Sequence, residues 1–393
     1  MKKLTIKTLL LLFASSCTVS EDPIRDPQVY ACPPMQGTNG EQHVKADKYQ
    51  TILDGTVSKG VPGIIMTVFD GRDGHGPWTG SSGKADLKNN VSLKNCNITR
   101  AGSTVKTFTA VTMLKLAEEG KLDLDDIAAQ YLPEETITDI ENADIATIRN
   151  LLQHSSGIYD YIQSPHFQTA SLNDLLKEWQ PNELLKYARG RKANFEPGTD
   201  VDYSNTNYIL LGMIIEEIEG KPFYQVFDEF IFGPLGLTFT SFASENPVPE
   251  NIIRGYIDLY GKLEVIDATQ YSGWDYHTAD GGLISNPYDL YLFLQAVVET
   301  EIISQNSFEE MTEWISPSYD DEIFYGLGLF KMKTKFGDAY MHSGDAIGYY
   351  ASMLYLPEYD SYICWAVNGN YGKIDEFTQS KEAIELFIEK VIF

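Results

Sequence analysis

Segments with the pattern of β-strands lie at both ends of this chain, and a long helical stretch separates them. Near the N-terminus, the apolar and partly β-branched run 61–69 is bounded by Gly60 and by the turn at 70–71. Near the C-terminus, strand-like alternation returns in residues 324–332, 339–342, 350–356 and 362–368. Because strands are stable only in a sheet, we expect the two ends to meet in one sheet, with the helical block inserted between them. The sequence therefore predicts an α+β fold with an all-α lobe.

Helical periodicity predicts the elements between these strands. Residues 103–120 repeat apolar side chains at helical spacing and end at Gly120, and residues 207–219 end at Gly220. Further helical segments, one with an expected break at Pro181, are 42–60, 145–154, 172–190 and 375–391. Two more strands are expected near Trp78 and over 97–101. A chain of 393 residues is long enough for two lobes, and the cleft between them is the natural place for a site.

The N-terminus has the order of residues found in a bacterial export signal. Three lysines precede an apolar run over 9–13, which is followed by small residues over 14–16 and then by Cys17. We therefore predict that residues 1–17 are a signal peptide with a partial lipobox, in which Cys17 becomes lipidated. The match is partial because Ala14 stands where that motif usually has Leu, and plain secretion is the alternative. The protein is expected in the bacterial cell envelope, with the lipid anchor as its contact with the membrane.

Composition along the chain sets the domain boundaries. Residues 18–40 are rich in Pro, Asp, Gly and Gln and lack an apolar period, so they are predicted to be a flexible tether. Residues 41–393 form the predicted folded domain. Its sheet lobe is expected over about 41–102 and 287–393, and its helical lobe over about 103–286.

Charge and cysteine usage exclude some classes of function. The formal net charge is −26, which argues against nucleic-acid binding and leaves either a plain acidic surface or an acidic cleft for cationic substrates. Cys364 lies in a buried strand pattern, whereas Cys32 and Cys96 either pair or stay free. The His and Cys residues lack the spacing of a metal site, so we expect no metal.

Ser103 and Lys106 are the first candidates for chemistry. They stand three residues apart at the start of a predicted helix, so they share one helix face. The helix dipole and desolvation disfavour an ammonium there, and a neutral Lys106 can take the proton from Ser103. The pair alone is a weak signal, because an N-capping Ser beside a surface Lys has the same pattern.

Two further groups of polar residues follow in the chain. Tyr203 and Asn205 lie just before a predicted helix, where Tyr203 can share the proton with Lys106 and Asn205 can hold Lys106 or a substrate amide. His342, Ser343 and Gly344 end a predicted strand, where a glycine lets a substrate backbone lie close to the strand edge. The structural alternatives are a packed Tyr, a capping Asn and a core His.

Together these three groups resemble the penicillin-binding protein and serine β-lactamase superfamily. Ser-x-x-Lys, Tyr-x-Asn and His-x-Gly, in this order, are typical of its branch with class C β-lactamases, D,D-carboxypeptidases, D-aminopeptidases and family VIII esterases. Segments 151–157 and 281–285 also resemble Leu-Leu-x-His-Thr-Ser-Gly and Gly-Gly-Leu-x-Ser markers of that branch. The resemblance covers residues from about 45 to the C-terminus. It implies an antiparallel sheet flanked by helices and a hydrolase without a cofactor.

The resemblance implies acyl transfer to Ser103, with a small molecule or a peptidoglycan-type peptide as the substrate. Lys106, Tyr203 and His342 would move protons, and the backbone N–H groups of Ser103 and Asp345 would form the oxyanion hole. Substrate would bind to the residues that complete the second and third motifs, Asn205, Ser343 and Gly344. His154, in the first marker, is expected to be structural. The oligomeric state is left open.

Asp345 departs from what the superfamily needs for a substrate with a free carboxylate. Members that cleave D-Ala-D-Ala bind that carboxylate beside the third motif, where an aspartate would repel it. The lysines at 331, 333 and 335 could compensate if they point inward. One hypothesis is therefore a preference for an amine-bearing or neutral acyl substrate, as in a D-aminopeptidase or a carboxylesterase. The alternatives are an ordinary D,D-carboxypeptidase, in which only the Asp345 backbone matters, and a non-catalytic sensor.

Overall fold

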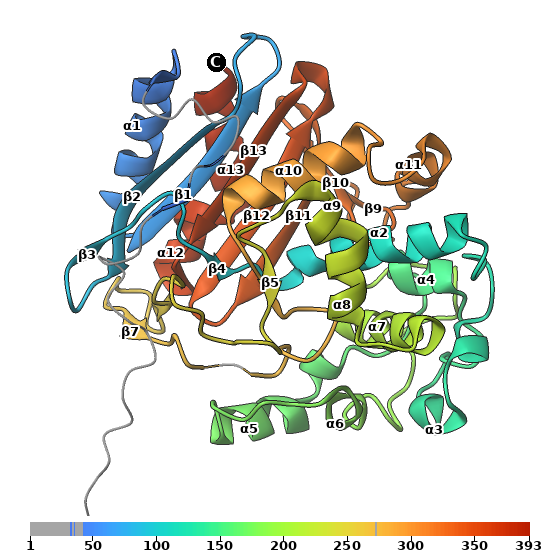
Figure 1. The fold of residues 1–393 in the computed structure, drawn as a ribbon. Coiled ribbons are helices and arrows are strands. Elements are labelled where there is room, and N and C mark those ends of the chain that lie inside the picture. The colour runs from blue at the N-terminus through green and yellow to red at the C-terminus, as the bar shows by residue number, and fades with distance from the viewer. Residues whose placement is uncertain (1–31, 34, 36–41, 272) are drawn as a thin grey trace, which may run out of the picture.

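The computed structural model describes residues 32–33, 35, 42–271 and 273–393 (Figure 1). The predicted signal peptide and Cys17 lie outside the described residues. Within them, no helix combines the length and apolar character needed to cross a membrane.

The centre of the fold is an eight-stranded antiparallel sheet built from both ends of the chain. Its strand order is β3-β2-β1-β13-β12-β11-β10-β9. Strand β1 pairs with β13 along its length, from Ile64 opposite Val367 to Asp70 opposite Ser361, so the predicted union of the two ends is confirmed. The strands are β1 Gly63–Asp70, β2 Trp78–Asp86, β3 Val91–Ser92, β9 Ile323–Tyr325, β10 Phe330–Thr334, β11 Gly337–Ala346, β12 Tyr349–Leu356 and β13 Ser361–Val367.

Helices cover both faces of this sheet (Figure 1). Successive side chains of β13 point to opposite faces. Trp365 packs with Tyr49 of α1 and Phe387 of α13 in one core, whereas Cys364 belongs to the other core together with residues of α2 and α10. Every residue of β13 is buried, which explains its continuous apolar pattern. The covering helices are α1 Ala46–Val57, α2 Val105–Glu118, α10 Pro287–Val298, α12 Gly372–Thr378 and α13 Lys381–Ile392.

After α2, the described part of the inserted segment contains short helices, a longer helix and four short strands. The longer helix is α7 Asn205–Glu219, which ends where Gly220 adopts the left-handed conformation, with φ 66°. The other helices are α3 Glu134–Ile137, α4 Ile148–Leu152, α5 Pro165–Asn173, α6 Pro181–Leu185, α8 Phe223–Phe227 and α9 Gly233–Leu235. The strands are β5 Ser241–Phe242, β6 Tyr256–Ile257, β7 Ile266–Asp267 and β8 Leu283–Ser285. Helix α11, Gln305–Met311, follows α10.

Four predicted elements differ from the structure. The single strand expected over 324–332 is two strands, β9 and β10, which pair antiparallel with each other. The strand expected over 97–101 is reduced to β4 Thr99–Arg100, which pairs with β8 and not with the main sheet. The helix expected over 172–190 is mostly loop. Two short helices stand near it, α5 over Pro165–Asn173 and α6 over Pro181–Leu185, and each begins at a proline, a residue suited to a first helical turn. The helix expected over 375–391 is two helices, since Ser380 caps a new start by accepting from the Ala383 N–H.

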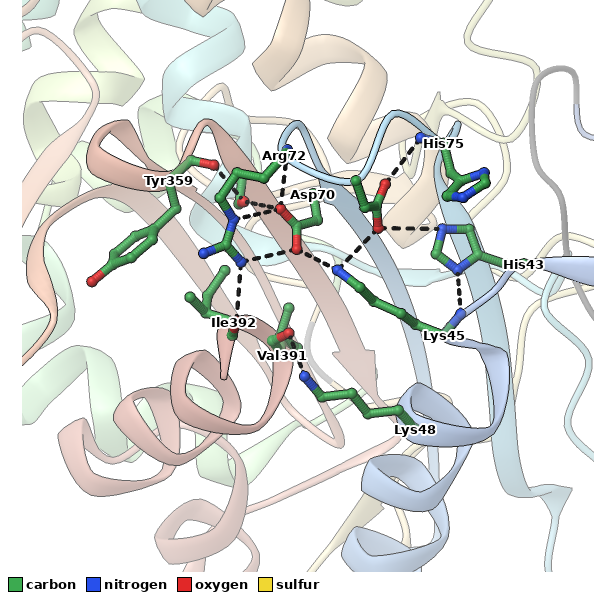
Figure 2. A network of polar contacts seen from close by, with 11 residues as sticks. His43, Lys45, Lys48, Asp70, Arg72, His75, Tyr359, Val391 and Ile392 are labelled. Atoms are coloured by element: carbon green, nitrogen blue, oxygen red, sulfur yellow. Dashed lines mark hydrogen bonds and ion pairs between the residues drawn. The ribbon is translucent and has the colours of Figure 1, made fainter.

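A polar network ties the N-terminal helix to the C-terminal helix beside the end of β1 (Figure 2). The buried Asp70 carboxylate accepts from the Arg72 guanidinium at 2.8 and 2.9 Å and from the Lys45 ammonium at 2.6 Å. Arg72 also donates to the carbonyl of Ile392, and Lys48 donates to the carbonyl of Val391. These carbonyls belong to the last turn of α13, which has no intrahelical donors for them. The network therefore caps α13 and anchors α1 at once.

Cys32 and Cys96 form a disulfide, with their Cα atoms 5.5 Å apart. This settles the pairing that the sequence left open. Cys364 is a buried free thiol in β13.

Candidate active site

Ser103 lies in a tight turn that leads directly into α2. Residues Gly102–Thr104 form a single 3-10 turn, and α2 begins at Val105. The Thr104 hydroxyl and N–H both donate to the Ala101 carbonyl, which holds the turn. Gly102 has φ 49°, a conformation that favours glycine, so the sequence before the serine suits this geometry. Ser103 is half-buried and lines a pocket.

Lys106 lies in the first turn of α2 and is fully buried. Its Nζ is 2.9 Å from the Ser103 Oγ, 2.9 Å from the Asn205 Oδ1 and 2.5 Å from the Asp280 carbonyl oxygen. Burial lowers the pKa of Lys106 to about 8, and the carboxylates of Asp280 and Asp160 act in the opposite direction. The amine is therefore available as a base at mildly alkaline pH.

The three neighbours of Lys106 determine the directions of the two N–H groups and the lone pair of its neutral amine. The Asn205 Oδ1 and the Asp280 carbonyl oxygen only accept hydrogen bonds, so they take the two N–H groups of the neutral amine. The lone pair then faces the Ser103 hydroxyl, which can donate. This geometry suits Lys106 to the removal of the Ser103 proton.

Tyr203 lies beside this pair and is held by His154. The Lys106 Nζ is 5.1 Å from the centre of the Tyr203 ring, and the His154 ring stacks on Tyr203 with the ring centres 4.2 Å apart. His154 Nδ1 also accepts from the Ser204 N–H, and His154 adopts a φ of 57°, which is uncommon for a residue other than glycine. Burial holds the pKa of Tyr203 well above its usual range, against a smaller effect of hydrogen bonding to Ser103. The phenol therefore stays protonated and suits proton donation better than proton removal.

The third motif brings β11 against the Ser103 turn. A Cβ on Gly344 would lie 1.8 Å from the Ala101 oxygen and 2.7 Å from the Ser103 nitrogen. A Cβ on Gly102 would lie 2.9 Å from the Asp345 nitrogen. The backbones around Ser103 and Asp345 are thus in contact, as a shared oxyanion hole requires. The use of these two N–H groups for an oxyanion stays a prediction.

His342 and Ser343 are less directly placed. The His342 Nδ1 is 2.7 Å from the Ser343 carbonyl oxygen, its ring stacks on Phe330, and Nε2 has no hydrogen-bond partner among the described residues. Burial lowers the pKa of His342 to about 3, so the ring is neutral at physiological pH. Neither His342 nor Ser343 is among the described residues that line the pocket, and their predicted roles stay predictions.

The pocket next to Ser103 has a volume of about 220 Å³ and two kinds of wall. The acidic residues Asp275, Asp280 and Asp345 line it, and burial raises the pKa of Asp275 to about 7. Five apolar or aromatic residues complete the lining together with Ser103, Tyr203 and Asn205, namely Ile162, Trp274, Ala346, Ile347 and Tyr371. Among the described residues, no Lys or Arg lines this pocket.

Asp345 is among the residues that line the pocket, and it is exposed to solvent. Its carboxylate accepts from the Asn370 amide. The groups packed around Asp345 raise the pKa of its carboxyl, although that hydrogen bond acts in the opposite direction. The three lysines offered as compensation lie elsewhere. Lys331 pairs with Asp338 at 3.6 Å, Lys335 pairs with Glu389 at 3.1 Å, and Lys333 donates to a backbone carbonyl.

Sequence patterns missed the acidic residues behind the pocket. Asp280 directly precedes the Gly281–Gly282 pair, and Asp160 follows the marker that ends at Gly157, so their positions beside two markers were a usable signal. Asp275 has no such signal, because a loop brings it to the pocket. Within the described residues, no cluster of three or more His, Cys, Asp or Glu side chains is arranged to hold a metal ion.

Two solved structures are similar to this chain over most of its length. One is a D-stereospecific amidohydrolase from Streptomyces sp., with 30% identity and a TM-score of 0.73, and the match covers 85% of this chain and 98% of that one. The other is a D-amino acid amidase from Ochrobactrum anthropi SV3 complexed with D-phenylalanine. It has 26% identity and a TM-score of 0.77, and the match covers 88% of this chain and 98% of that one.

Curated relatives and a family model lead to the same family. Penicillin-binding protein 4* of Bacillus subtilis is 28% identical over 327 residues, which is 80% of this chain and 69% of that protein. The chain spans between 43% and 69% of the length of this and other curated relatives that it matches. The family model described as Beta-lactamase matches residues 42–384. The chain therefore belongs to the beta-lactamase family of serine hydrolases.

Proposed function

We propose that this chain is a serine amidohydrolase that acts on amides or peptides whose acyl part carries a free amino group. The observation that carries this proposal is the pocket beside Ser103, which is lined by three aspartates and, among the described residues, by no Lys or Arg. At the mildly alkaline pH at which Lys106 becomes neutral, Asp275 is ionised, so a free substrate carboxylate would meet like charge there, whereas an ammonium would meet opposite charge. The apolar residues on the other wall, Ile162 and Trp274 among them, suit a hydrophobic side chain on the acyl part.

In the proposed reaction, Lys106 removes the Ser103 proton while Oγ attacks the amide carbon. The oxyanion is held by the N–H groups of Ser103 and Asp345, the C–N bond breaks, and the leaving amine takes a proton from the Lys106–Tyr203 pair. Water then attacks the resulting ester and gives its proton to Lys106. The acid is released and Ser103 regains its hydrogen. The placement of Lys106 2.9 Å from Oγ supports the first step.

The similar solved structures support the choice among acyl substrates. One is a D-stereospecific amidohydrolase, and the other is a D-amino acid amidase complexed with D-phenylalanine. An amino acid amide with an apolar side chain also matches the acidic and apolar walls of this pocket. We therefore extend the proposal to D-amino acid amides and to peptides with an N-terminal D-residue.

A matched pair of substrates tests the proposal. D-phenylalanine p-nitroanilide and its N-acetyl derivative differ in the ammonium group, so their kcat/KM values isolate its contribution. We expect the free amine to be cleaved at least about tenfold faster, equivalent to ~1.4 kcal/mol, and Ser103→Ala to be inactive on both. Equal rates, or faster cleavage of a D-Ala-D-Ala peptide or of short p-nitrophenyl esters, would reject the amine preference. Absence of any fluorophosphonate adduct on Ser103 would reject the enzyme itself in favour of a binding or sensor role.

A further inference from the structure

The buried Asp160 carboxylate lies directly behind the Asn205 side chain. Asp160 is 5% exposed, and the segment that carries it leads into a 3-10 turn that begins at Tyr161. The Asp160 Oδ1 accepts from the backbone N–H of Ile162 at 3.2 Å and from that of Asn205 at 3.3 Å. The Asn205 Nδ2 donates to the Asp160 Oδ2 at 3.2 Å and lies 3.4 Å from the Oδ1. Asp160 is not part of the three motifs that predict the site.

These contacts determine which way the Asn205 amide faces. A carboxylate accepts only, so the Asn205 Nδ2 must face Asp160 and the Oδ1 must face Lys106. When the Asn205 Oδ1 faces Lys106, the neutral amine donates one N–H to that oxygen. The lone pair of the amine then stays directed at Ser103. With the amide reversed, Nδ2 would donate to that lone pair and compete with the Ser103 hydroxyl.

We propose that Asp160 is a positioning residue that fixes the amide orientation of Asn205 and thereby directs the lone pair of Lys106 at Ser103. The inference rests on the proposed role of Ser103 as the nucleophile. The ionisable groups that act on Asp160 are Lys106 and Asp280. Burial raises the pKa of Asp160 to about 6, so its carboxylate is present at the alkaline pH at which Lys106 is neutral.

The substitution Asp160→Asn has a defined consequence. The oxygen of the new amide stays where Oδ1 is, because the backbone N–H groups of Ile162 and Asn205 both donate there. Its nitrogen then replaces Oδ2, the nearer acceptor of the Asn205 Nδ2, and two donors cannot pair. The Asn205 Nδ2 keeps only the longer 3.4 Å contact with the oxygen at the Oδ1 position. The Asn205 amide is expected to reverse and turn Nδ2 toward Lys106. Loss of the charge also lowers the pKa of Lys106, because Asp160 raises it.

The test measures the rate of fluorophosphonate labelling of Ser103 between pH 6 and 10, which needs no knowledge of the natural substrate. We expect Asp160→Asn to lower the alkaline plateau about tenfold, as for partial loss of a general base, and to move the acid limb to lower pH. In an Asn205→Ala background, where no amide can reverse, Asp160→Asn should change the plateau less than about twofold. An equal loss in both backgrounds, or an unchanged plateau, would overturn the inference.

The exchange variant Asp160→Asn/Asn205→Asp serves as the rescue. Its carboxylate at position 205 presents an acceptor to Lys106 and to the new amide at position 160 at once, so its plateau should recover toward that of the wild type. The acid limb should move to higher pH, because a carboxylate beside Lys106 raises the pKa of the amine, so labelling is followed until the rate levels off. Thermal midpoints monitor folding. A folded exchange variant no faster than Asp160→Asn would overturn the inference. If Asp160→Asn does not fold, an exchange plateau at least about tenfold below that of the wild type would overturn it. No labelling of the wild type would instead overturn the proposed function, so the two failures are distinguishable.

Discussion

The chemistry of Lys106 follows from burial and from two acceptors. A fully buried ammonium loses its hydration, and the two oxygens from Asn205 and Asp280 compensate only in part. The same oxygens orient the neutral form. The side chain is thus both easier to deprotonate and aimed at Ser103 once it is neutral.

We predict that the labelling rate of Ser103 rises with pH. Lys106 is a base only when neutral, so the rate should rise tenfold per pH unit below about 8 and level off above it. Lys106→Met keeps the side-chain length without an amine, and it should lower the plateau by about 10² to 10⁴ and flatten the profile. Lys106→Arg, which stays charged, should be equally slow. A wild-type rate independent of pH between 6 and 10 would contradict the prediction.

At this scale the sequence predicted the residues that motif spacing connects. Short spacing places Ser103 beside Lys106 and Tyr203 beside Asn205. The two pairs meet across 99 residues, and only the resemblance to the superfamily predicted that contact. Asp160 reaches Asn205 only through the tertiary fold, across 45 residues. A contact of this kind leaves no periodicity in the sequence.

At the scale of elements, the close approach of β11 to the Ser103 turn depends on Gly344. The space between the Ala101 carbonyl and the strand does not admit a methyl group, since its carbon would lie 1.8 Å from that oxygen. Neither backbone can retreat without cost, because β11 is paired with β10 and β12 and the turn continues into α2.

We predict that Gly344→Ala separates β11 from the turn and removes the oxyanion site. Acylation of Ser103 should fall by about 10² or more, the loss expected for an oxyanion-hole donor. Gly55→Ala is the matched control, because a Cβ there meets nothing within 4 Å and alanine favours the helix α1. Labelling rates and thermal midpoints of both variants check this. A Gly344→Ala variant that labels at the wild-type rate would contradict it.

Element types were predicted better than element boundaries. Strand β13 and helix α7 have strong patterns, and both formed where expected. The break between α12 and α13 depends on the Ser380 cap, which interrupts an apolar pattern that continues across it. The pairing of β4 with β8 brings together segments about 180 residues apart, and local propensity carries no information about such a partner.

At the scale of the whole molecule, the two ends of the chain hold each other in place. The pairing of β1 with β13 joins the two ends of the chain at the centre of the sheet. The Asp70 network joins α1 to α13 beside the end of β1. Arg72 and Lys45 hold the pKa of the Asp70 carboxyl well below its usual range, against the effect of burial. The sequence predicted the shared sheet, because both ends have strand patterns. It did not predict this network, whose charges come from segments far apart.

We predict that Asp70→Asn destabilises the fold in a pH-dependent way. Asp70 is buried, but Lys45 and Arg72 can partly return to water, so we expect a loss of about 1 to 2 kcal/mol at pH 7. A carboxyl with a depressed folded-state pKa stabilises above its unfolded pKa, near 4, and loses that effect as the pH falls toward the folded value. The stability difference between wild type and Asp70→Asn should therefore shrink below about pH 4.

Chemical unfolding at several pH values measures this difference. Glu389→Gln is the control, because the Lys335–Glu389 pair is half exposed on both sides and should contribute less than about 1 kcal/mol. The network joins the last turn of α13 to β1, so the loss should also appear as faster amide exchange in α13. If the stability difference between wild type and Asp70→Asn stays constant from pH 7 to 3, the Asp70 charge is not what stabilises the contact between α1 and α13. A loss for Glu389→Gln as large as that for Asp70→Asn would mean that burial of the carboxylate adds nothing.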